Sequence, residues 1–167
     1  MVMLRLRSRV TSNDRFWIGA QLLLFGWSIA AGIRELRRRR WRPGRNSAAL
    51  AAPLALAAVA VAELARRALG RNLSMAPTPV RGGHLVDSGI YGVVRHPMYL
   101  SALLGLLAWA IGTGARAAAL AVPVGIAFFS AKARHEESLL EHRYEDYDAY
   151  RRKVAGRLLP RAPRNTS

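Results

Sequence analysis

Residues 84–101 (HLVDSGIYGVVRHPMYLS) hold the side chains of this 167-residue sequence that are best suited to chemistry. Arg95 supplies a positive charge and His96 a hydrogen-bonding ring, and Pro97 follows them directly. Proline is favoured at the first position of a helix because its missing N–H would be unpaired there. We therefore expect a helix from Met98, whose N-terminus attracts anions. The segment indicates an anion-binding corner beside Arg95 and His96.

A second polar group follows later in the chain. Six of the ten acidic residues lie between Glu136 and Asp148. Tyr144, Tyr147 and Tyr150 recur at intervals of three, so they are expected on one face of an amphipathic helix, where a packing or interfacial role is favoured. The carboxylates are expected to be solvated or paired with Arg143, Arg151 and Arg152; this set comprises Glu137, Glu141, Glu145, Asp146 and Asp148.

The apolar residues that must position these groups come in blocks, as in membrane proteins. The blocks cover residues 16–33, 47–65, 98–112 and 115–131. The sequence therefore predicts an all-α integral membrane bundle of about four transmembrane helices, followed from Lys132 by a C-terminal amphipathic helix. A cleavable signal peptide is the alternative for the first block, but the arginines after Ile33 are typical of a stop-transfer flank.

Charge and composition narrow the functional classes. The net charge of +16 is compatible with nucleic acid, but no nucleic-acid motif accompanies it, and basic segments beside apolar spans suit anionic membranes equally well. The absence of cysteine excludes disulfides and thiolate catalysis. No histidine pair has the spacing of a metal site, so we expect no metal.

The organisation divides into residues 1–69, with two spans and a basic connection, and residues 70–167, with a long loop, a helical hairpin and the C-terminal helix. Four spans place both termini and the 66–97 loop on one side with 18 of the 26 lysines and arginines. The excess of positive charge favours the cytoplasm for that side. Seven arginines in residues 34–46 then lie on the opposite side, which the same rule leaves unexplained.

Two motifs carry a resemblance to a known family. They are GIYGVVRHPMY at residues 89–99 and EESLLEHRYEDYDAYRRKVAGRLLP at residues 136–160. In this order they resemble the isoprenylcysteine carboxyl methyltransferase family and the broader group of phospholipid-methyltransferase-like membrane enzymes. The resemblance covers about the C-terminal half of the chain, and its motifs are specific for the group but not for the substrate.

The resemblance implies methyl transfer from S-adenosylmethionine, with S-adenosylhomocysteine as product, to a lipid or lipid-like substrate in the bilayer. It implies an integral protein of the bacterial inner (plasma) membrane whose site faces the cytoplasm; the oligomeric state stays open. Arg95, Lys132, Arg134 and Glu136 are the implied catalytic and substrate-binding residues, where Lys132 stands in place of the arginine of the family. The implied cofactor contacts are Leu85, Val86, Tyr91, His96, Pro97, Met98, Tyr99 and Glu136.

The chemistry leaves the acceptor open. Methyl transfer requires donor and acceptor to be aligned more than it requires acid or base. A carboxylate acceptor needs no base, whereas an amine must be deprotonated, for which His84, Glu63 and Glu137 are candidates. Glu63 is instead expected to pair with Arg66 or Arg67 along a helix. An amine N-methyltransferase and a cofactor-binding membrane protein without activity are the alternative functions.

Overall fold

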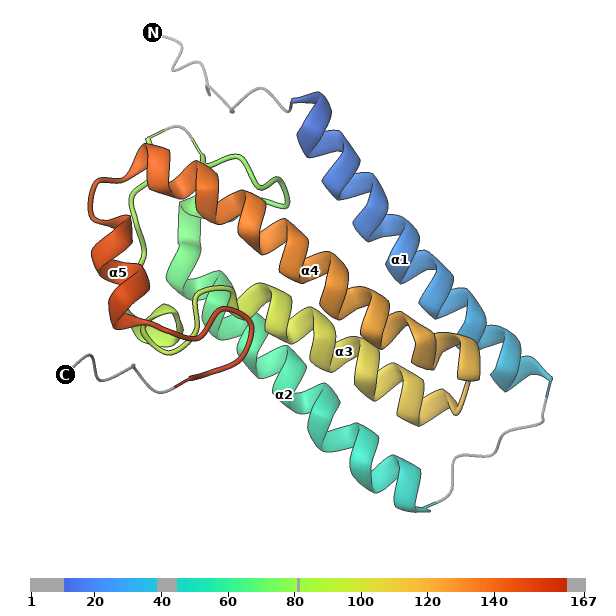
Figure 1. Ribbon diagram of the computed structural model, residues 1–167. Coiled ribbons are helices and arrows are strands. Elements are labelled where there is room, and N and C mark those ends of the chain that lie inside the picture. Colours follow the sequence, from blue (N-terminus) through green and yellow to red (C-terminus); the bar gives the residue numbers. More distant parts are fainter. Residues whose placement is uncertain (1–10, 39–44, 81, 162–167) are drawn as a thin grey trace, which may run out of the picture.

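The computed structural model describes residues 11–38, 45–80 and 82–161, and these residues form helices and loops with no strand. Residues 39–44 of the arginine-rich connection lie outside the described residues. Four long helices are followed by one short helix (Figure 1). They are α1 (Ser12–Arg37), α2 (Arg45–Leu69), α3 (Pro97–Thr113), α4 (Arg116–Arg143) and α5 (Tyr147–Lys153), with 3₁₀ turns η1 (Gly70–Asn72) and η2 (Gly89–Gly92).

The helix lengths confirm a helical membrane bundle. Three segments are long and apolar enough to cross a bilayer: Ser12–Arg37, Asn46–Asn72 and Arg116–Arg143. Helix α3 is apolar but has only 17 residues. At 1.5 Å per residue it spans roughly 25 Å, a little less than the hydrocarbon thickness of a bilayer. The protein is therefore a membrane protein with three full-length apolar helices and one shorter one.

The helices pack so that the polar segments meet at one end of the bundle. Helix α2 lies along α3, while α1 packs against α3 and α4. The end of α2, the start of α3 and the end of α4 gather near α5 (Figure 1). At the opposite end, Gly114 joins α3 to α4 with a left-handed φ of 63°, a conformation that glycine adopts without strain.

The predicted boundary at Lys132 is wrong. Helix α4 continues without interruption to Arg143, because residues 132–143 contain neither glycine nor proline and consist largely of helix-forming residues. The chain turns at Tyr144, and Tyr147 and Tyr150 lie on the separate helix α5. The division at residue 69 stays a prediction, although α2 contributes much of the surface against which α3 packs.

The contact between α1 and α3 depends on two small residues. Ser28 and Gly32 lie one turn apart on α1 and are both buried. The Trp109 side chain of α3 fills the space above them, and its Nε1–H donates to the Ser28 carbonyl oxygen at 2.9 Å. Small residues of this kind let membrane helices approach closely. A Cβ at Gly32 would overlap the Trp109 ring.

We therefore expect Gly32→Ala to destabilise the bundle by about 1–3 kcal/mol, the usual cost of overpacking. Thermal unfolding in detergent micelles measures the effect. Gly26→Ala is the matched control, because nothing lies within 4 Å of a Cβ at that position of the same helix. Equal melting temperatures for the two variants would contradict the proposed contact.

The start of α1 is tied to the long loop. Thr11 caps the helix in a capping box with Asp14, which is almost fully buried. The other oxygen of Asp14 accepts from the Thr78 hydroxyl at 2.7 Å. Asp14 thus positions the 73–80 segment, which forms one wall of the cavity described below.

Candidate functional site

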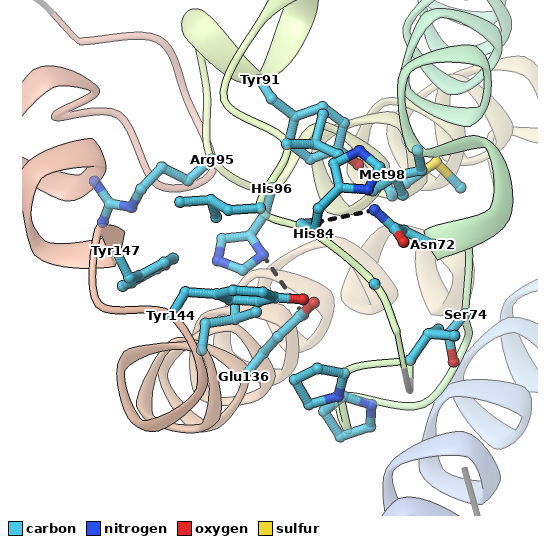
Figure 2. Close-up of a pocket in the computed structure, with 18 of the residues that line it drawn as sticks. Asn72, Ser74, His84, Tyr91, Arg95, His96, Met98, Glu136, Tyr144 and Tyr147 are labelled. Atoms are coloured by element: carbon cyan, nitrogen blue, oxygen red, sulfur yellow. Dashed lines mark hydrogen bonds and ion pairs between the residues drawn. The ribbon is translucent and has the colours of Figure 1, made fainter. Parts of the chain in front are cut away.

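A cavity opens at the end of the bundle where the polar segments meet (Figure 2). It encloses about 860 Å³, part of which is open to solvent. Its walls come from the 72–86 loop, the Tyr91–Tyr99 segment, the end of α4 and α5.

The two adjacent glutamates of α4 point in different directions. Glu137 is buried, with 4% of its side chain exposed, and lies behind the cavity. Its carboxylate accepts from Arg95 Nε at 2.9 Å and lies 3.1 Å from His96 Nε2. Arg157 supplies a third partner at 2.8 Å. Glu137 therefore joins the start of α3 to the C-terminal segment, and the expectation that it is solvated or paired with surface arginines is wrong.

Backbone bonds reinforce this junction. The N–H groups of Arg95 and His96 donate to the carbonyl oxygens of Gly156 and Arg157 at 2.9 and 3.0 Å. The Arg95 guanidinium also donates to the Val154 carbonyl oxygen. Arg95 is only 8% exposed, so its guanidinium is not available to lipid headgroups at the membrane surface. The Arg95 guanidinium is thus paired with Glu137 and held between α4 and the C-terminal segment.

Glu136, in contrast, lines the cavity. Its carboxylate accepts from the Tyr99 hydroxyl at 2.6 Å, and His96 Nδ1 lies 3.6 Å away (Figure 2). The His96 and Tyr99 rings stack with their centroids 5.2 Å apart. The side chain of Glu136 keeps 27% of its surface exposed. His96 and Tyr99 thus lie beside Glu136, whose carboxylate is partly exposed at the cavity.

Tyrosines supply the aromatic wall. Tyr150 donates its hydroxyl to the Tyr91 carbonyl oxygen at 2.8 Å, which fixes α5 against η2. The buried Tyr147 hydroxyl has no hydrogen-bond partner within the described part of the chain. Burial raises the pKa of Tyr147 well above its usual value, so its hydroxyl remains a neutral donor. An unpaired buried donor costs free energy, and an ordered water or a bound polar group would satisfy it.

Lys132 and Arg134, the two basic residues predicted to bind the substrate, do not line the cavity. Lys132 is fully buried beneath the cavity, where its Nζ donates to Gln21 Oε1 at 2.7 Å and to the Met75 carbonyl oxygen at 3.0 Å. The same ammonium lies 5.4 Å from the centre of the Tyr99 ring. Arg134 is exposed and is not part of the cavity wall. Lys132 therefore ties α4 to α1 and to the loop.

Most of the predicted cofactor residues share the cavity. Pro97 is the exception, since it is buried at the first turn of α3 and does not reach the wall. The role of the predicted residues in cofactor binding stays a prediction. The wall includes Leu85, Val86, Tyr91, Arg95, His96, Met98, Tyr99 and Glu136.

Of the three candidate bases, the structure brings His84 to the cavity (Figure 2). Glu63 forms the expected ion pairs, with Arg66 Nε at 2.7 Å and Arg67 Nε at 2.6 Å. Glu137 is enclosed by its basic partners.

Sequence reasoning missed several residues of the site. Asn72 holds the loop by donating from Nδ2 to the His84 carbonyl oxygen at 2.9 Å. Ser74 and Thr78 also line the wall. The long 70–97 loop, rich in proline and glycine, signalled a functional segment but not which of its side chains face inward. Arg157 lies in the C-terminal segment, and no local pattern indicated that it reaches Glu137.

Comparison with known proteins agrees with this arrangement. No curated protein matches the chain. The sequence pattern that defines the phospholipid methyltransferase family matches residues 47–147. The match spans more than half of the chain and includes α2, the cavity loop, α3, α4 and the start of α5. The expected broad group is thus confirmed: the chain belongs to the phospholipid methyltransferase family.

Proposed function

We propose that this protein transfers a methyl group from S-adenosylmethionine to an amphiphilic lipid at the cytoplasmic face of a bacterial inner membrane. The observation that carries the proposal is that one cavity at the end of a membrane bundle is lined by Glu136, with its partly exposed carboxylate, and by Tyr147, whose buried hydroxyl has no partner among the described residues. Membership of a methyltransferase family supports the reaction class.

The wall fits the polar groups of the donor. Glu136 suits an ammonium group or a ribose hydroxyl, because a carboxylate accepts hydrogen bonds from both. The Tyr147 hydroxyl is a neutral donor for a carboxylate or a ring nitrogen. The faces of Tyr91 and Tyr144 suit the adenine ring or the sulfonium, which aromatic rings attract. When bound, S-adenosylmethionine supplies an electrophilic methyl group, and these side chains hold it in line with the acceptor.

The wall also favours an amine acceptor over a carboxylate. Arg95, the arginine in the described wall, is neutralised by Glu137, and neither Lys132 nor Arg134 reaches the cavity. A carboxylate acceptor would therefore meet Glu136 without a free arginine or lysine from these positions. An amine acceptor has His84 in the wall to take its proton. We accordingly place an aminolipid first and a prenylcysteine carboxylate second.

Incubation of the purified protein with methyl-labelled S-adenosylmethionine and membrane lipids tests this function. We expect label in the lipid extract, with more product from aminophospholipids than from prenylcysteine analogues. The opposite ratio would support the isoprenylcysteine activity instead. Cofactor binding with no label in any lipid would support the alternative of a membrane protein that binds the cofactor without turnover.

A further inference from the structure

A second cavity is lined by the end of α1 and by the turn that joins α3 to α4. Both segments lie at the end of the bundle opposite α5 (Figure 1). It encloses about 1190 Å³, much of it open to solvent. Neither the candidate active site nor its supporting contacts include its residues. A function that uses the first cavity alone therefore leaves this one unexplained.

The side chains of the second cavity are mainly cationic. Arg34 lies in the last turn of α1, Arg38 caps the end of that helix, and Arg116 comes from the first turn of α4. Glu35 is the acidic side chain of the described wall, so the arginines outnumber it three to one. Within residues 11–38, 45–80 and 82–161, none of these four side chains forms an ion pair. The charges are thus available to an external anion.

The N-terminus of α4 lies at the same place, together with the C-terminal ends of α1 and α3. Helix α4 has 28 residues, begins at Arg116, and has neither a side-chain cap nor an acidic residue in its first turn. The positive end of its dipole therefore stays uncompensated by the helix itself. Three arginines and an open helix N-terminus around one cavity suit a phosphate group, which arginine binds through paired N–H donors.

Apolar side chains border the charged residues. Trp27 lines the cavity and is 43% exposed, and tryptophan is enriched where membranes meet water. Leu120, one turn beyond Arg116 on α4, is 60% exposed. Lipid chains suit such surfaces, whereas a free inorganic anion does not use them. The cavity thus combines an anion site with the apolar border that an amphiphile requires.

We propose that the second cavity binds the phosphate of an anionic phospholipid headgroup, in the leaflet opposite the candidate active site. Basic pockets between membrane helices on the cytoplasmic side bind such headgroups, and the arginines here offer the same chemistry in the other leaflet. The proposal gives a role to three of the arginines on the side that the positive-inside rule disfavours, since Arg34, Arg38 and Arg116 would be neutralised by lipid. It does not rest on the methyl-transfer reaction.

Native mass spectrometry of the delipidated full chain, titrated with phosphatidylglycerol, tests the site. Losing two arginine–phosphate contacts of 1.5–3 kcal/mol each, reduced by solvent exposure, weakens binding by about tenfold or more. We expect that loss in Arg34→Gln/Arg116→Gln. Arg34→Lys/Arg116→Lys keeps the charge and is expected to retain most of the affinity. Phosphatidylcholine is expected to bind more weakly than phosphatidylglycerol to the unmodified chain.

Arg37→Gln/Arg143→Gln is the control, because it removes two exposed arginines from the last turns of α1 and α4 without touching the cavity. We expect this control to bind phosphatidylglycerol as the unmodified chain does. Equal losses in both glutamine pairs would overturn the site in favour of general charge attraction. Inorganic phosphate as the stronger ligand would overturn the lipid assignment. The methyl-labelling experiment tests the first cavity, and its result does not depend on the result of this titration.

Discussion

Replacing Glu137 with alanine is expected to unfold much of the site and to cost about 3–5 kcal/mol, the usual effect of removing one partner from a buried ion pair. The variant would leave the buried Arg95 guanidinium without its carboxylate, and would also release His96 and Arg157. Thermal or denaturant unfolding in micelles measures the loss. Protease cleavage after Arg157 is expected to become faster, because the C-terminal segment would lose its anchor.

Glu141→Ala provides the control for this substitution. Glu141 lies one turn later on α4 and pairs with the exposed Arg151 at the surface. Surface ion pairs contribute about 0–1 kcal/mol, so little change in stability is expected. If the two alanine variants melted at the same temperature, Glu137 would not hold the junction that the structure shows.

The second large effect is expected at Glu136, the residue that precedes Glu137. Glu136→Gln should leave the fold intact, because a glutamine oxygen still accepts from the Tyr99 hydroxyl and the side chain is partly exposed. The negative charge toward the cavity would be lost. A hydrogen bond to a charged group contributes about 1.5–3 kcal/mol, so affinity for S-adenosylhomocysteine should fall roughly 10- to 150-fold.

Calorimetric titration of the purified protein measures this affinity. Glu145→Gln removes an exposed carboxylate from the same region outside the cavity wall and is expected to bind S-adenosylhomocysteine normally. Unchanged affinity in Glu136→Gln, together with an unchanged melting temperature, would remove Glu136 from the cofactor site. The paired experiment thus separates a binding role from a structural one.

Much of the fold followed from sequence because apolar blocks of bilayer length leave few alternatives to helices. The ion pair of Glu63 with Arg66 and Arg67 was also predictable, since residues three and four apart share a helix face. The end of α4 was harder to predict from the sequence. Hydropathy drops at Lys132, but no glycine or proline ends the helix there. Helix α4 therefore continues as a polar helix beyond its apolar span.

The candidate site, like the fold, could be predicted from the sequence only in part. The meeting of Tyr99 with Glu136 was predicted from the family resemblance, whereas the opposite orientation of Glu137 was not. Adjacent residues on a helix point about 100° apart, so one glutamate can face a cavity while the next is buried. Which one is buried depended on Arg157 in the distant C-terminal segment. No local pattern in the sequence places that arginine beside Glu137.

The most direct test of the account is an experimental structure of the protein in a lipid bilayer with S-adenosylhomocysteine bound. We expect the ligand in the first cavity, with polar atoms within hydrogen-bond distance of Glu136 and of the Tyr147 hydroxyl. A ligand bound away from the 72–86 loop and Glu136, or with the Tyr147 hydroxyl still unpaired beside it, would contradict the central claim.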